Sequence, residues 1–112
     1  MKIVKETISR EELRRMASEG FGNMVKAAVD LEKGILAVEA ELHSDLEALL
    51  LDAGSQQKDL WGINLYPDLQ GEEFVEFDSM INIRPSQGNH TRGVADPAAR
   101  KRIAELVAKK VR

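Results

Sequence analysis

The stretches DLWGINLY (residues 59–66) and FVEFDSMINIR (residues 74–84) decide the predicted fold. Both are rich in aromatic and β-branched residues, and the polar segment 67–73 between them contains a proline and a glycine, which is typical of a β-hairpin. Because strand side chains alternate, one side of this hairpin is expected to be a core face of Trp61, Ile63, Leu65, Val75, Phe77, Ile81 and Ile83. The other side is expected to carry a polar row of Asn64, Tyr66, Glu76, Asp78, Asn82 and Arg84.

The segment before this hairpin predicts another hairpin, with arms 24–31 and 35–42. The turn Glu32-Lys33-Gly34 joins the arms, and its glycine can adopt positive φ. Apolar and polar residues alternate along the arm 35–42, as in a half-buried strand. This arm is also rich in alanine and leucine, so a helix is the alternative.

Three helices are indicated by their capping residues. The first is expected to begin after Ser9, which forms a capping box with Glu12, and the second after Ser44, which has the same spacing to Glu47. The third is expected to begin at Asp96, with proline in the first helical position. The order of elements is therefore helix, hairpin, helix, hairpin, helix.

This order predicts an α+β layer fold, in which two hairpins form a four-stranded antiparallel sheet and three helices pack on one face of it. A chain of 112 residues has the usual size of one domain, and the sequence shows no linker or repeat. Residues 1–112 are therefore expected to form a single domain. The hydrophobic share of 43% and the charged share of 31% are typical of a globular protein.

The composition excludes several classes of protein. The chain has no cysteine, which excludes a disulfide framework, a thiolate metal site and a cysteine nucleophile. No apolar run approaches the roughly 20 residues that span a bilayer, so a membrane protein is not expected. The first residues lack the apolar core of a secretory signal, which favours the cytoplasm. Nothing in the sequence indicates an oligomeric state.

Charge is strongly segregated along the chain. Residues 30–78 carry 13 acidic and 2 basic side chains, whereas residues 79–112 carry 8 basic and 2 acidic ones. These two blocks could neutralise each other within the fold, or their field could steer a charged ligand. The basic block would suit nucleic acid, but an isoelectric point of about 5.4 and an aromatic share of 4% disfavour a dedicated nucleic-acid-binding protein.

The loop RPSQGNHTRGVAD, residues 84–96, is the first candidate site because it combines arginines, small polar residues and glycines just before the third helix. Arginine binds oxyanions bidentately, and glycine lets backbone N–H groups approach an anion. The leading hypothesis is therefore a small binding module for an anionic, phosphate-bearing ligand, such as a nucleotide, or for an anionic partner. The expected ligand-binding residues are Arg84, Ser86, Asn89 and Arg92, with Asn64 and Asn82 from the polar row.

The alternative is an ordered surface loop whose arginines pair with the acidic block. The loop has neither the Walker spacing nor the dinucleotide-binding spacing of glycines, so no cofactor is indicated.

Two further functions stay open. Glu41, His43 and Asp45, preceded by Glu39, could hold a divalent metal or act as acid and base, so a metal-assisted hydrolase is one alternative. Their spacing matches no dedicated metal motif, so the sequence assigns no metal ligand and no catalytic residue. It leaves open whether the protein is an enzyme. The other alternative is a protein-interaction module that docks a partner on the acidic block or an exposed strand edge.

Three blocks of the sequence resemble a known family. They are ILAVEAELHSDLE (residues 35–47), DLWGINLYP (residues 59–67) and SMINIRPSQGN followed by RGVADP (residues 79–97). The chain is similar over nearly its whole length to small prokaryotic proteins known only as a domain of unknown function, with the patterns LWGxNxYP and SxINIRPxxGNxxRxVxDP. The resemblance implies no activity, cofactor or catalytic residue.

Overall fold

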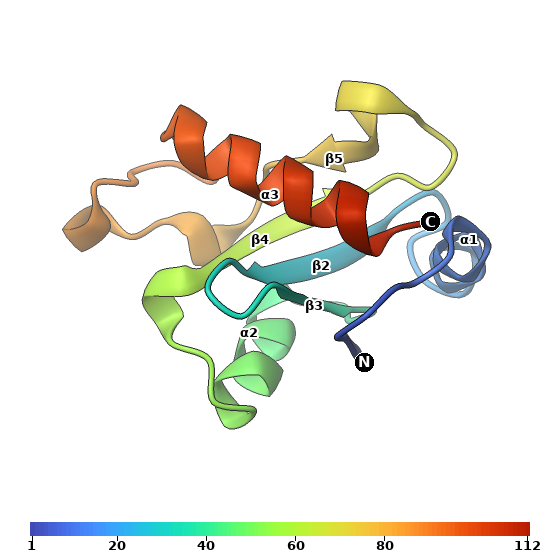
Figure 1. Cartoon of the computed structure of the whole chain (residues 1–112), viewed down its shortest axis with the longest axis horizontal. Coiled ribbons are helices and arrows are strands. Elements are labelled where there is room, and N and C mark those ends of the chain that lie inside the picture. Colours follow the sequence, from blue (N-terminus) through green and yellow to red (C-terminus); the bar gives the residue numbers. More distant parts are fainter.

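A computed structural model describes all residues, 1–112, as an α+β fold with three α-helices and one open sheet (Figure 1). The α+β class is confirmed. The strands are β1 (Lys2–Val4), β2 (Val25–Asp30), β3 (Ile35–Val38), β4 (Leu60–Leu65) and β5 (Val75–Glu76). The helices are α1 (Arg10–Glu19), α2 (His43–Asp52) and α3 (Pro97–Lys110). Short 3-10 turns are η1 (Gln57–Asp59), η2 (Gly71–Phe74), η3 (Met80–Asn82) and η4 (Pro85–Gln87).

The sheet has five antiparallel strands in the order β1-β3-β2-β4-β5, so the predicted number of four was wrong. The hairpin of β2 and β3 forms as expected, and Gly34 in its turn has a φ of 66°. The additional strand is β1, in which Ile3 lies opposite Ala37 of β3. Three residues are too few to show a strand period, because alternation is read over four to eight residues.

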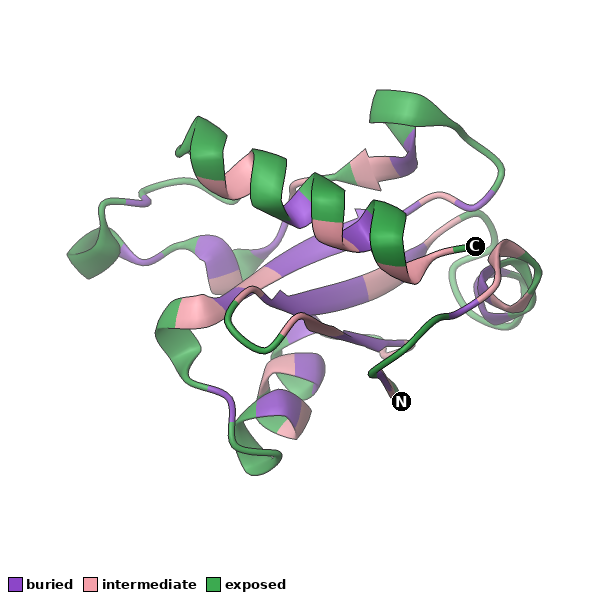
Figure 2. Ribbon diagram, in the orientation of Figure 1, coloured by how far each residue is buried: buried purple, intermediate pink, exposed green.

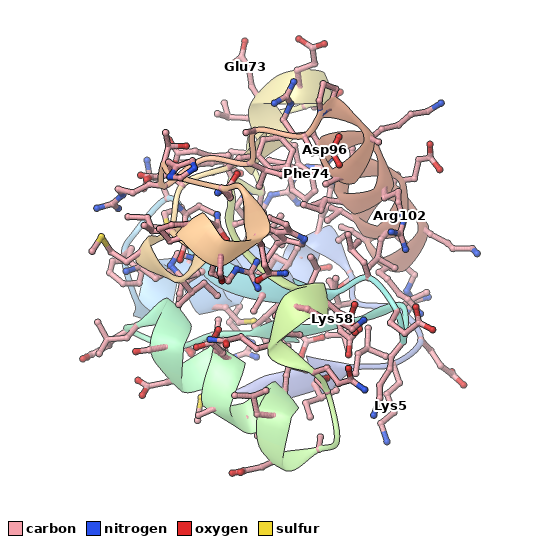
Figure 3. All side chains as sticks on the ribbon, turned by 90° about the vertical axis from the view of Figure 1, so that its left-hand side faces the viewer. Lys5, Lys58, Glu73, Phe74, Asp96 and Arg102 are labelled. Atoms are coloured by element: carbon pink, nitrogen blue, oxygen red, sulfur yellow. The ribbon has the colours of Figure 1, made fainter.

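Helices cover both faces of the sheet, not one as predicted. Helices α1 and α3 pack on the face that carries Val29 and Ile63, whereas α2 packs on the face that carries Ala28 and Leu60. In Figure 3, α2 and Arg102 of α3 lie on opposite sides of the strands. The prediction of one covered face was wrong because the central strands are buried on both faces. Such strands lose the alternation of apolar and polar residues that marks a sheet with one face in solvent. Figure 2 shows this burial along β2 and β4.

The second arm of the second hairpin is much shorter than predicted. Strand β5 has only two residues, and the chain then leaves the sheet and turns at η3. Ile83, expected in the core, is 38% exposed, whereas Asn82 and Arg84, expected in an outer polar row, are 0% and 7% exposed. Gly62 of β4 explains why the buried and exposed residues of this segment are reversed. A Cβ placed at Gly62 would lie 2.5 Å from the Cβ of Ser79, so only glycine lets the turn at η3 lie against the strand.

The capping predictions were right for two of the three helices. The hydroxyl of Ser9 accepts from the backbone N–H of Glu12, and the carboxylate of Asp96 accepts from that of Ala98. Helix α2 instead begins at His43, without a side-chain cap, so the predicted start at Ser44 was wrong. Packing of Leu46 against the sheet sets this start. None of the three helices is long and apolar enough to cross a membrane.

Candidate functional site

Arg84, the central residue of the predicted anion loop, points into the protein. Its two terminal nitrogens donate to the backbone carbonyl oxygens of Gln57 and Leu60, and its guanidinium lies 4.3 Å from the ring centre of Trp61. Burial lowers the pKa of Arg84, and the nearby carboxylate of Glu47 opposes that shift. These contacts tie residues 84–89 to the start of β4, so they hold the fold together at this edge.

Three of the predicted ligand-binding residues are buried amides that bind the backbone. Asn82 accepts from the N–H of Gly62 at 2.8 Å and donates to the carbonyl oxygens of Gly62 and Arg92, each at 2.9 Å. Asn64 donates to the carboxylate of Glu76 at 2.8 Å. Asn89 donates to the carbonyl oxygens of Asn82, Thr91 and Gly93, and accepts from the N–H of Ala95. The amide N–H groups of all three residues thus already donate within the protein, whereas the side-chain carbonyl oxygen of Asn64 is buried without a partner.

The remaining two predicted residues, Ser86 and Arg92, are exposed. Arg92 donates to the carboxylate of Asp78 at 2.6 Å, which is the internal pairing with the acidic block that the sequence allowed. Asp78 contacts Asn64 near the end of β4, whereas Arg84 contacts Leu60 at its start. The two arginines therefore bind at opposite ends of β4. Anion binding by this loop stays a prediction, and only Ser86 and Arg92 of its predicted ligand-binding residues face solvent.

The candidate hydrolase residues are not brought together. Strand β3 ends at Val38, so Glu41 and His43 do not share a strand face. His43 is buried, with its Nε2 at 2.8 Å from the carbonyl oxygen of Ile63, whereas Glu41 and Asp45 are exposed. Burial lowers the pKa of His43 from its ordinary value of 6.5, and Lys26 and Arg92 lower it further. No group of three histidine or carboxylate side chains could hold a metal ion.

The structure shows an apolar groove that the sequence did not predict. It lies between α3 and β5, with a volume of about 750 Å³. Phe74, Val75, Phe77 and Val107 form its apolar lining, and the exposed residues Ala104 and Ala108 of α3 lie along its wall. In Figure 1, α3 lies next to β5, the edge strand of the sheet, and α2 lies on the other side of the strands. We call this site the α3–β5 groove.

Three cationic side chains line the α3–β5 groove: Arg10, Arg100 and Lys101. One terminal nitrogen of Arg10 donates to the carbonyl oxygens of Pro67 and Leu69, and its guanidinium lies 4.0 Å from the ring centre of Phe74. One terminal nitrogen of Arg100 likewise donates to the carbonyl oxygens of Val94 and Ala95.

Neither arginine forms an ion pair. Their other guanidinium nitrogens have no hydrogen-bond partner and are not buried. The backbone thus fixes two guanidinium groups beside apolar surface and leaves part of each free to bind an anion. Glu72 is the one acidic side chain in the lining.

Part of this site left a local signal in the sequence. Arg100, Ala104, Val107 and Ala108 recur at helical spacing on α3, next to the buried stripe that contains Ile103, and Val111 continues this spacing at the C-cap. The rest could not be found by such reasoning, because Arg10 and Phe74 lie far away in the chain and come from other elements.

The fold and the groove define a small α+β protein with an antiparallel sheet covered by helices on both faces. The chain belongs to the family described as "Protein of unknown function (DUF5674)", whose model matches residues 2–110. Comparisons with curated proteins and with solved structures give no match.

Proposed function

We propose that the protein is a binding module whose α3–β5 groove receives an acidic, apolar segment of a partner protein. The observation that carries the proposal is the pair of guanidinium groups, of Arg10 and Arg100, which the backbone holds at an apolar groove without a carboxylate partner. Arginine next to aromatic surface is the combination that dominates the energy of many interfaces. A carboxylate of the partner would complete the hydrogen bonding of each group.

The shape of the groove favours an elongated occupant. Sites for small molecules usually bury most of the ligand, whereas Lys101, Ala104 and Ala108 leave one wall of this groove exposed. The alanines bring little bulk, so the backbone of a partner helix can approach α3 closely. An amphipathic helix beside α3 would cover Val75 and Phe77, which are only partly buried.

The proposed ligand is anionic, like the ligand predicted from the sequence, but different residues are expected to bind it. The loop 84–96 and the α3–β5 groove are both predicted to bind anions, but through different residues. Amide shifts in an NMR titration distinguish them, because binding in the groove should move the resonances of residues 71–77 and 100–111, and binding at the loop should move those of residues 86–92.

The test uses two helical peptides with the same leucine stripe, one flanked by glutamates and one by lysines. At low salt, the glutamate peptide should bind about tenfold more tightly, since two or three partly exposed ion pairs contribute about 1.4 kcal/mol in total. The substitution Ala104→Glu should abolish this preference by filling the groove with a like charge. Ala98→Glu is the matched control, because Ala98 is an exposed residue of α3 outside the groove.

Fluorescence anisotropy of the labelled peptides measures the affinities. Equal affinity for the two peptides would refute the proposal, as would full binding of the glutamate peptide by Ala104→Glu. Shifts of residues 86–92 alone would instead support the loop as the anion site.

A further inference from the structure

A second cleft lies away from the α3–β5 groove and shares no residue with it. It has a volume of about 570 Å³ and lies between the end of α1, the start of β2 and the connection from β3 to α2. Its lining contains three glutamates and one lysine, so its charge is opposite to that of the groove: Glu19, Glu39, Glu41 and Lys26. We call this site the α1–α2 cleft.

Large apolar side chains stand exposed at the α1–α2 cleft. Phe21 is 47% exposed and Leu42 is 56% exposed, and Met24 between them in the lining is partly buried. Phe21 lies between Gly20 and Gly22, and Gly22 has a φ of 100°, which holds the phenylalanine on a sharp turn outside the helix. Apolar residues that gather at a cleft in this way mark surfaces that bind partners.

The aromatic ring in this cleft already contacts a cation. The ammonium of Lys26 lies 5.1 Å from the ring centre of Phe21, and it forms no ion pair although three carboxylates line the same cleft. Contact of an ammonium with an aromatic face is favourable, most of all where water is partly excluded. Lys26 thus contacts the aromatic ring instead of pairing with a carboxylate of the cleft.

Two of the three carboxylates are unpaired. Glu19 binds Arg15 at 3.1 Å, but Glu39 and Glu41 have no ion-pair partner. Glu39 is also the only residue other than glycine with positive φ, at 71°, where its N–H donates to the carbonyl oxygen of Lys26. This conformation turns the chain out of β3, so that residues 39–42 line the cleft.

We infer that the α1–α2 cleft is a second docking site, for a partner segment that carries a lysine or arginine beside an apolar residue. The apolar residue would contact Phe21 and Leu42, and the cation would pair with Glu39 and Glu41. The argument for this occupant is charge complementarity: two unpaired carboxylates against one lysine leave the cleft with a net negative charge. The inference does not depend on the α3–β5 groove, because neither its residues nor its ligand charge are shared.

The test titrates the protein with a short capped peptide containing Leu-Arg-Leu and with the same peptide containing citrulline, the uncharged isostere of arginine. The arginine peptide should cause saturable amide shifts at residues 20–26 and 39–42. The citrulline peptide should bind about tenfold more weakly, which corresponds to the loss of the pairs with Glu39 and Glu41. The double variant Glu39→Gln/Glu41→Gln should weaken the arginine peptide to the same level.

The matched control is the double variant Glu6→Gln/Glu32→Gln, which removes the same charge from exposed residues outside the cleft and should bind normally. A dispersed amide spectrum shows that each variant is folded. No saturable shifts at millimolar arginine peptide, equal binding of the citrulline peptide, or equal weakening by the control variant would each overturn the inference.

Discussion

The substitution Asn82→Ala should strongly destabilise the protein. The amide of Asn82 is fully buried and pairs with both the N–H and the carbonyl oxygen of Gly62, and with the carbonyl oxygen of Arg92. This amide therefore forms hydrogen bonds with the edge of β4 at a point where β5 has already ended. An alanine there leaves the buried N–H and carbonyl oxygen of Gly62 without partners, whereas the carbonyl oxygen of Arg92 still accepts from the N–H of Ser79.

The structure sets the magnitude of this effect. Each buried backbone group that loses its partner costs about 1–3 kcal/mol, so the loss of two predicts about 2–6 kcal/mol in the free energy of unfolding. That is a large part of the roughly 5–15 kcal/mol that stabilises a typical domain. With an unfolding entropy of about 2.1 cal/mol/K per residue, the melting temperature should fall by roughly 9–25 °C.

Ile83→Ala is the companion variant that makes this test decisive. If residues 77–84 formed the predicted strand, Ile83 would be a core residue, and its truncation would cost about 2–5 kcal/mol. The observed turn leaves Ile83 partly exposed, so the expected cost is below about 1 kcal/mol. Urea unfolding followed by the fluorescence of Trp61, the only tryptophan, measures both variants. A larger loss for Ile83→Ala than for Asn82→Ala would refute the turn and its contacts with Gly62.

Three other predictions follow from single residues. Because burial lowers the pKa of His43 below 6.5, the unfolded chain takes up a proton more readily than the folded one. The free energy of unfolding should therefore be highest above about pH 6.5 and should fall below it. In urea titrations, His43→Gln should lose this part of the pH dependence, and His90→Gln, at an exposed position, should keep it. Glu39→Gly should raise the melting temperature by about 2–4 °C in calorimetry, since relief of positive φ, about 1–2 kcal/mol, exceeds the entropic cost of glycine. Arg84→Lys should lose one of two carbonyl contacts and the stacking on Trp61, at a cost of about 1–3 kcal/mol in urea unfolding.

The sequence predicted those elements whose signals are local. The capping residues Ser9 and Asp96 act on N–H groups two or three positions away, so the starts of α1 and α3 could be found from the sequence. The hairpin of β2 and β3 was found for the same reason, because its turn and its alternation lie within a short segment.

The parts that depend on distant contacts could not be predicted. The segment 77–84 has the period of a strand, but Gly62 and Asn82 make a turn against β4 more favourable than continued pairing. Likewise, Ser44 has the local signature of a cap, yet α2 begins before it, where Leu46 and the hydrogen bond of His43 to β4 place the helix. In both cases, tertiary packing overrides a valid local preference.

Distant contacts also decide which arginines can form the candidate site, and the sequence could not show them. An arginine can bind an external anion only where the protein has not already used its N–H groups, and backbone carbonyls decide this. Arg84 uses both terminal nitrogens inside the fold, whereas Arg10 and Arg100 each use one and keep the others accessible. The sequence identifies arginines that suit an anion, but only the folded chain shows which carbonyls they reach.

The folded chain shows whether the segregated acidic and basic blocks of the sequence pair with each other. If the acidic and basic blocks neutralised each other, several ion pairs would join residues 30–78 to residues 79–112. The structure has one, between Asp78 and Arg92. The two blocks therefore do not neutralise each other, and part of their charge lines two separate sites: Arg100 and Lys101 line the α3–β5 groove, and Glu39 and Glu41 line the α1–α2 cleft. Raising the salt concentration should weaken binding at both sites, because screening acts on exposed pairs of either polarity.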